Sequence, residues 1–133
     1  MEHIAPHIGV VVVDHGSKRP AANEMLVEMC RIYAEATGAA IVEPAHMEIA
    51  EPTIAQAFER CVGRGARAVV VLPYFLSPGR HSMRDIPRLT EEAAAAHPDI
   101  PCRIAEPFGI DDRLAAVMHR RVLESLRAAN RST

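Results

Sequence analysis

The sequence contains no tryptophan, and aromatic residues make up only 4% of the chain. Proteins that bind single-stranded nucleic acid without sequence preference stack bases on aromatic side chains, so this composition argues against such a surface. The net charge of −2 at pH 7 also gives no overall attraction to nucleic acid or to anionic membranes. We therefore expect neither nucleic acid nor a membrane as a partner.

Long apolar runs and paired cysteines are lacking as well. The longest apolar run, Ala68–Leu76, is far shorter than the roughly 20 residues that cross a bilayer. The first residues, Met1–His7, have neither the basic region nor the apolar stretch of a signal peptide. Cys30, Cys61 and Cys102 are odd in number and form no CxxC motif, which is typical of reduced thiols. These observations predict a cytoplasmic protein.

What the sequence does contain is an alternation of strand-like and helix-like segments along its 133 residues. β-Branched runs predict strands at 8–13, 40–47, 67–76 and 100–105, and apolar residues at three- and four-residue spacings predict helices at 20–37, 51–63, 85–97 and 111–130. Crossovers this short require parallel strands with helices on both faces of the sheet. We therefore predict one α/β domain over residues 1–133, a three-layer sandwich of about four strands and four helices. Pro44 favours an outer position for the second strand.

The ends of three predicted strands bring an unusual set of side chains to one edge of the sheet. His15 follows the first strand, Glu48 the second, and His81 the segment after the third. Ligands bind at the carboxyl ends of the strands in an open parallel sheet. Two imidazoles and a carboxylate suit a borderline divalent transition metal. His46 would share a face with Glu48 in a regular strand and is an additional candidate, whereas Asp14 would point away from His15.

Each of these residues also has an ordinary explanation when taken singly. A histidine at a strand end is more often a loop or capping residue, and Glu48 alone fits a solvated charge equally well. Asp14 fits a structural role as well as a functional one. The joint occurrence of two histidines and a glutamate is what favours a metal site.

The loop after the first strand matches neither of two common site motifs. It lacks the second glycine of the G-x-S-x-G nucleophile elbow, and it is not a G-x-x-x-x-G-K-[ST] phosphate loop. Ser17, at the entry to a helix, suits hydrogen bonds to backbone N–H groups or to an anion. Asn23 either reaches back into this loop or is a solvated helix residue.

Basic residues are concentrated around the two histidine loops. They are Lys18, Arg19, Arg80, Arg84 and Arg88. Such a cluster is often only a solvated face, but guanidinium groups also bind carboxylates in a bidentate manner. Beside a metal site, the cluster predicts a ligand that carries several carboxylates.

Several motifs together carry a resemblance to a known family. They are the D-H-G-S segment Asp14–Ser17 with Asn23, His46–Ile54 with its E-P-T-I sequence, Gly63–Ala66, Pro73–His81 and Asp85–Pro87. In this order they resemble the small sirohydrochlorin chelatases, the short CbiX and SirB proteins among the class II chelatases, over nearly the whole chain. The resemblance implies a chelatase-like (flavodoxin-like) α/β fold and a homodimer.

The resemblance also implies roles for the matched residues. His15 and His81 fall on the family's two active-site histidines, and Glu48 falls on its metal-binding glutamate. The family inserts Fe²⁺ or Co²⁺ into the polycarboxylated tetrapyrrole sirohydrochlorin, so the divalent metal is a co-substrate and no permanent cofactor is expected. The residues expected to bind this substrate are Ser17, Lys18, Arg19, Asn23, Arg80 and Arg84.

The choice of metal and two other classes of function are left open. The sequences around Asp14, His46 and His81 look most like the plant-type iron chelatases, which favours Fe²⁺ and sirohaem synthesis over Co²⁺ and cobalamin synthesis. The cysteine-rich C-terminal motif of some plant members is absent, so no iron–sulfur cluster is predicted. A metal or tetrapyrrole carrier would use the same residues without turnover. A phospho-accepting receiver domain would need an aspartate at the end of the third strand, where Tyr74–Leu76 stands instead.

Overall fold

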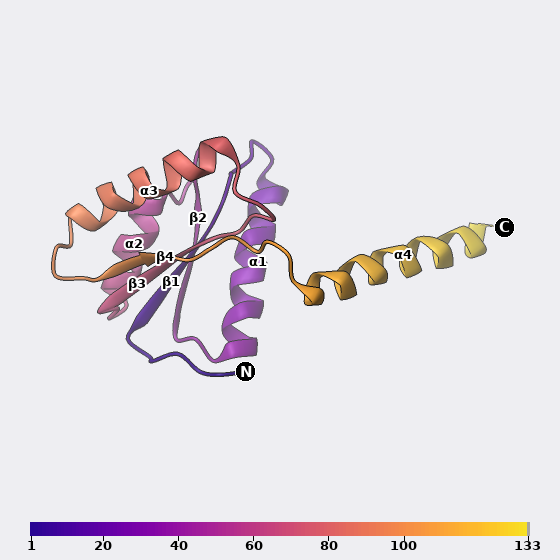
Figure 1. Cartoon of the computed structure of the whole chain (residues 1–133), viewed down its shortest axis with the longest axis horizontal. Coiled ribbons are helices and arrows are strands. Elements are labelled where there is room, and N and C mark those ends of the chain that lie inside the picture. Colours follow the sequence, from indigo (N-terminus) through magenta and orange to yellow (C-terminus); the bar gives the residue numbers. More distant parts are fainter. Residues whose placement is uncertain (133) are drawn as a thin grey trace.

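The computed structural model describes residues 1–132, apart from the side chains of residues 81, 131 and 132. In this part of the chain four strands alternate with four helices (Figure 1). In order they are β1 (Ile8–Asp14), α1 (Pro20–Thr37), β2 (Ile41–His46), α2 (Ile54–Gly63), β3 (Ala68–Pro73), α3 (Arg80–Ala95), β4 (Cys102–Ile104) and α4 (Asp112–Ser132). No helix among the described residues is long and apolar enough to span a membrane.

The strands form one parallel sheet in the order β2-β1-β3-β4. β1 therefore lies between β2 and β3, and β2 is an edge strand, as Pro44 predicts. α1 packs on one face of the sheet, and α2 and α3 pack on the other (Figure 1). The predicted three-layer α/β architecture is confirmed.

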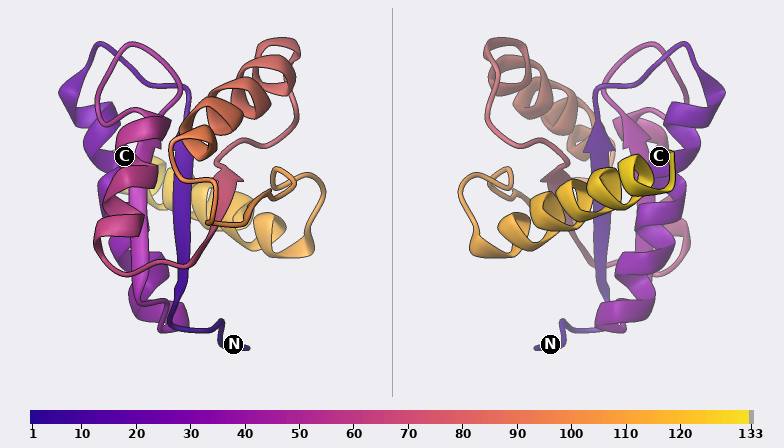
Figure 2. Two further views of the ribbon diagram at one scale, coloured as in Figure 1. Left: turned by 90° about the vertical axis from the view of Figure 1, so that its left-hand side faces the viewer. Right: turned by 90° about the vertical axis from the view of Figure 1, so that its right-hand side faces the viewer.

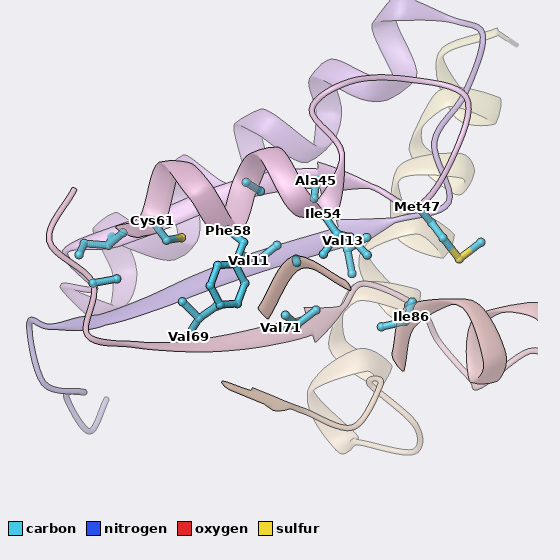
Figure 3. Packing of buried hydrophobic residues seen from close by; sticks show 14 of the residues in the cluster. Val11, Val13, Ala45, Met47, Ile54, Phe58, Cys61, Val69, Val71 and Ile86 are labelled. Carbon is cyan, nitrogen blue, oxygen red and sulfur yellow. The ribbon is translucent and has the colours of Figure 1, made fainter. Parts of the chain in front are cut away.

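The valines of β1 show why both faces of the sheet are covered. Val11 and Val13 are fully buried against the side of α2 and α3, and Val10 and Val12 face α1. Figure 3 shows the larger of the two clusters, in which the ring of Phe58 from α2 packs against the strands. A run that is apolar on both sides is what a strand in the middle layer of a sandwich requires.

The start of α2 differs from the prediction. The helix begins at Ile54, with Thr53 as its N-cap: Thr53 Oγ1 accepts the N–H of Gln56 (3.1 Å), and Gln56 Oε1 accepts the N–H of Thr53 (2.9 Å). This reciprocal capping box fixes the first turn. Glu51 and Pro52, which are joined by a cis peptide bond, belong to the preceding loop and not to the helix.

The start of α3 also differs, and the difference bears on the site. α3 begins at Arg80 rather than at 85, and Pro87 lies inside it. The N–H of Gly79 donates to Ser82 Oγ (2.9 Å), and this hydroxyl donates to the carbonyl oxygen of Gly79 (3.0 Å), which closes the first turn. The segment predicted as a loop is therefore helical, and His81 is the second residue of α3.

Three elements, β3, β4 and α4, differ from the prediction in length or in position. β3 ends at Pro73, and β4 has only three residues. α4 leaves the sandwich after β4 and projects away from the sheet and the other helices (Figure 1).

Candidate functional site

The loop between β1 and α1 is held by its own side chains. Asp14 Oδ1 accepts the N–H of Gly16 (3.0 Å), and Ser17 Oγ accepts the backbone N–H two residues further on (3.0 Å). Asn23 reaches back from α1, since its Oδ1 accepts the N–H of Ser17 (2.9 Å) and its Nδ2 donates to the carbonyl oxygen of Ser17 (2.8 Å). Of the two alternatives for Asn23, contact with the loop is the one found. The loop that carries His15 therefore has a defined backbone.

This loop lies directly against the loop that follows β2. The N–H of Met47 donates to the carbonyl oxygen of Asp14 (2.8 Å), and the N–H of Glu48 donates to that of His15 (3.1 Å). Gly16 has a φ of +91°, and a Cβ at this position would lie 2.0 Å from the carbonyl oxygen of Glu48. Only glycine permits so close an approach in this conformation. The pairing of β1 with β2 thus continues beyond the strands and places His15 and Glu48 next to each other.

The residue after Glu48 has an unusual backbone conformation. Ile49 has a φ of +75°, which β-branched residues rarely adopt, and its side chain is exposed. The loop is fixed around it, because the N–H of His46 donates to the carbonyl oxygen of Pro52 (2.8 Å) and the N–H of Ala50 to that of Glu48 (2.8 Å). Strain of this kind costs about 1–3 kcal/mol and is found mainly at functional sites. Here it lies beside a predicted metal ligand.

Asp14 and His46 form a pair beneath the two loops. His46 Nδ1 lies 2.6 Å from Asp14 Oδ1, and the imidazole is only 2% exposed. Because a carboxylate can only accept, Nδ1 carries the proton and donates it. Asp14 is therefore turned toward His46. His46 is therefore a buried and oriented side chain, in contrast to the exposed His15.

The ring of His15 packs on Phe75, which follows β3. The ring centroids are 4.3 Å apart, and the planes are tilted by 33°. Phe75 also lines a cavity of about 310 Å³ together with Ser82 and Met83 of α3. In Figure 2 the loops after β1 and β2 and the start of α3 lie at the end of the sheet opposite the N-terminus. Three segments far apart in the sequence therefore meet at this edge, which we name the rim.

His81, the third predicted ligand, lies in the first turn of α3, and its side chain is outside the described residues. Among the side chains that the structure does describe, no three His, Cys, Asp or Glu residues form a group that could hold a metal ion. His15 and Glu48, the other two predicted ligands, are both exposed at the rim. That His81 completes them stays a prediction.

The cations predicted to bind substrate are exposed around the rim. They are Lys18, Arg19, Arg80 and Arg84. None of them forms an ion pair with a residue in the described part of the chain. Arg88, one turn further along α3, differs, because it pairs with Asp85 (3.5 Å) and Glu92 (3.2 Å). The four unpaired cations leave positive charge at the rim for an anionic ligand.

Two residues of the site are not singled out by the residue pattern. Phe75 supports the ring of His15, and Ile49 holds the strained turn beside Glu48. The position of Phe75 could have been found from the sequence, because Val13 pairs with Pro73 and Phe75 therefore lies beside His15, two residues further along each segment. Nothing in the sequence indicates the positive φ of Ile49.

Comparison with known proteins adds independent information about this chain. A family model described as CbiX matches residues 9–125. The chain is 48% identical over 118 residues to the chloroplastic sirohydrochlorin ferrochelatase of Arabidopsis thaliana. This alignment covers 89% of this chain and 52% of the Arabidopsis protein. It is 32% identical over 124 residues to the sirohydrochlorin cobaltochelatase of Sulfurisphaera tokodaii. This second alignment covers 93% of this chain and 98% of the Sulfurisphaera protein. The chain thus spans about half the length of the Arabidopsis protein.

Solved structures share the fold. The putative cobalamin biosynthesis CbiX protein of Marinobacter aquaeolei VT8 matches with a TM-score of 0.77 at 28% identity, covering 92% of this chain and 98% of that one. SirB of Bacillus subtilis with Fe³⁺ matches with a TM-score of 0.78 at 30% identity, covering 85% of this chain and 45% of that one. The likeness therefore extends over most of the chain and is not limited to a shared sheet.

Proposed function

This chain belongs to the CbiX family, and we propose that it is a sirohydrochlorin chelatase that inserts Fe²⁺ into the metal-free tetrapyrrole. The observation that carries the proposal is the backbone hydrogen bond from Glu48 to His15, which joins a carboxylate-bearing and an imidazole-bearing residue at the carboxyl edge of the sheet. Both side chains are exposed and can therefore receive an ion from solution. Two such ligands suit Fe²⁺ or Co²⁺ better than a hard cation such as Mg²⁺.

Metal insertion requires the ion to lose water and two pyrrole N–H groups to lose their protons. An imidazole near neutral pH can hold a divalent ion or accept a proton. His15 and His81 are assigned these two tasks, and Glu48 offsets the charge of the ion and passes protons to solvent. The metal is a co-substrate, so no permanent cofactor is part of the proposal.

The macrocycle is assigned to the cations around the rim. Lys18, Arg19, Arg80 and Arg84 are exposed and have charge available for its carboxylates. Ser17 and Asn23 shape the loop on which two of these cations stand. His46 is assigned a supporting role, because its Nδ1 is already engaged by Asp14.

Iron is proposed as the native metal, and cobalt is the alternative. The relative at 48% identity is named a ferrochelatase, whereas that at 32% identity is named a cobaltochelatase. Competition of Fe²⁺ and Co²⁺ for sirohydrochlorin under anaerobic conditions, followed by absorption, decides between sirohaem and cobalamin synthesis. We also propose a single domain over residues 1–133 that acts in the cytoplasm as a homodimer, because one four-stranded unit offers a large flat macrocycle only part of a cleft.

The proposal is tested by metal insertion in the variants His15→Ala, His81→Ala and Glu48→Ala. We expect turnover to fall by about 100-fold or more when an acid–base group or ligand is lost. His3→Ala, at an exposed position beside Gly38 at the C-terminal end of α1, is the matched control and should retain full turnover. Near-normal turnover of His15→Ala would contradict the proposal. Protein that binds sirohydrochlorin but leaves its metal-free absorption unchanged with both metals would instead be a carrier.

A further inference from the structure

The backbone conformation at Ile49 does not favour an isoleucine. Its φ of +75° and the hydrogen bond from the N–H of Ala50 to the carbonyl oxygen of Glu48 (2.8 Å) are those of a γ-turn with a positive φ at its centre. This is the rarer and more strained of the two forms of γ-turn. A β-branched residue seldom adopts such a φ, whereas glycine adopts it without a steric penalty. Local conformation alone would therefore favour glycine here.

Packing within the chain does not favour an isoleucine at this position either. The side chain of Ile49 is 61% exposed, so the described part of the chain provides little of the free energy that burial would give. Met47, two residues earlier, is by contrast buried in the core. A strained residue with an exposed apolar side chain is typical of a site that contacts a ligand.

The γ-turn is fixed beside the predicted metal ligands. It begins at Glu48, whose N–H donates to the carbonyl oxygen of His15 (3.1 Å). The carbonyl oxygen of Glu48 also occupies the space that a side chain at Gly16 would need. Both loops of the rim therefore hold the turn, and Ile49 directly follows a predicted ligand.

The other two segments of the rim each carry an exposed apolar side chain as well. Leu76, which is 68% exposed, follows Phe75, on which the ring of His15 packs. Met83, which is 65% exposed, lies in the first turn of α3, as does His81. Single apolar side chains are ordinary on a protein surface, but three of them around one predicted site favour a ligand with an apolar surface.

The charges of the rim indicate which ligand this is. Lys18, Arg19, Arg80 and Arg84 are exposed, and none forms an ion pair with a residue in the described part of the chain. The rim of a second copy would bring the same cations and be repelled. A polycarboxylated tetrapyrrole instead brings an apolar ring face with carboxylates at its periphery, which complements apolar side chains among cations.

We infer that Ile49 is a substrate-contacting residue, whose side chain rests on the apolar ring face of the tetrapyrrole beside Glu48. The γ-turn keeps this side chain out of the core and presents it at the rim, and contact with the ring offsets the strain when the substrate is bound. Leu76 and Met83 extend the same contact surface, while the cations bind the carboxylates. The inference rests on the proposed function, because it takes the proposed substrate as the ligand.

Three substitutions of Ile49 separate the strain from the contact. Ile49→Gly and Ile49→Ala both remove the apolar surface, but only Ile49→Gly relaxes the turn; Ile49→Val keeps the strain and most of the surface. Contact on one side buries roughly half of the side chain. We therefore expect the dissociation constant of metal-free sirohydrochlorin, measured by its absorption, to rise about fivefold or more in Ile49→Gly and Ile49→Ala and to stay within about twofold in Ile49→Val. Ile4→Gly, exposed before the amino end of β1, is the matched control and should bind like the wild type.

Stability and binding should change in opposite senses in Ile49→Gly. Because glycine adopts a positive φ without a steric penalty, we expect the midpoint of its urea unfolding to lie at or above that of the wild type. A residue with only a structural role would lose stability when replaced. A lower midpoint in Ile49→Gly would therefore contradict the inference, and circular dichroism verifies that all variants are folded.

The outcomes separate this inference from the proposed function. If the wild type binds and metalates sirohydrochlorin but folded Ile49→Ala binds it equally well, the inference is wrong and the proposed function stands. If the wild type does not bind sirohydrochlorin, both are wrong. Unchanged binding with a weaker dimer in sedimentation velocity would assign Ile49 to contact between copies and would likewise overturn the inference.

Discussion

Replacing Gly16 with alanine tests whether contact between the two rim loops holds the site together. An alanine Cβ would lie 2.0 Å from the carbonyl oxygen of Glu48 and 3.2 Å from Cβ of His46. The φ of +91° costs an L-residue about 1–2 kcal/mol by itself. Relief of the overlap requires one loop to shift, and overpacking of this kind costs about 1–3 kcal/mol. We therefore expect Gly16→Ala to lower the free energy of unfolding by about 2–5 kcal/mol.

Gly65 supplies the matched control. Its φ of +99° is also left-handed, but a Cβ at this position would meet no atom within 4 Å. Gly65→Ala therefore carries only the backbone cost of about 1–2 kcal/mol. Urea unfolding of both variants gives the difference between them, which isolates the contact of Gly16 with Glu48 and should be about 1–3 kcal/mol.

The same two variants separate stability from activity. A shifted loop moves Glu48 relative to His15, and a misplacement of about 1 Å can lower a rate about 100-fold. We expect a loss of this order in metal insertion by Gly16→Ala, at a temperature where it is folded, and near wild-type insertion by Gly65→Ala. Equal losses of stability in the two variants, or full turnover by folded Gly16→Ala, would refute the reasoning.

Two further predictions concern buried groups. Asp14→Ala removes the acceptor of His46 Nδ1, so we expect urea unfolding to show a free energy of unfolding lower by about 1–3 kcal/mol. Asp14→Asn keeps an acceptor and should lower this free energy by less. An unchanged free energy of unfolding in Asp14→Ala would argue against the pair. Burial raises the pKa of Cys30 and of Cys61 to about 12, whereas an unfolded thiol ionises near about pH 8.5. As the pH rises, the thiols of the unfolded chain therefore lose their protons before those of the folded chain. The free energy of unfolding keeps its whole contribution from each thiol below about pH 8.5, and it falls by about 1.4 kcal/mol per pH unit for each thiol up to about pH 12. Urea unfolding at a series of pH values measures the slope of the free energy of unfolding against pH. This slope should be shallower in Cys30→Ala by the contribution of one thiol. Identical slopes in the wild type and in Cys30→Ala would count against this explanation.

The strands and the rim could be predicted because both depend on simple local and topological rules. The run Val10–Val13 is apolar on both faces, which identifies a strand covered on both sides. Once the strands are parallel, their carboxyl ends meet at one edge. His15 and Glu48 are therefore brought together whatever the exact bounds of the helices.

The start of α3 could not be predicted, because its local signals conflict. Pro87 is typical of a first helical turn, and the Pro-Gly pair before it is typical of a loop. In the fold, Ser82 closes an earlier turn with Gly79, and Ile86 is buried in the core. Tertiary packing thus outweighs the hydrogen bond that Pro87 cannot donate.

The rim divides its polar side chains between support and binding. Asp14 Oδ1 and His46 Nδ1 form a hydrogen bond with each other. This pair depends on the register of β1 with β2, which the sequence does not specify. His15 and Glu48 are exposed instead, although hydrogen bonds fix their backbones. A metal that is a substrate must leave its ligands for the macrocycle, so a site with open coordination positions serves better than a closed one. The residue pattern predicts the ligands, and the register of β1 with β2 fixes the backbones that carry them.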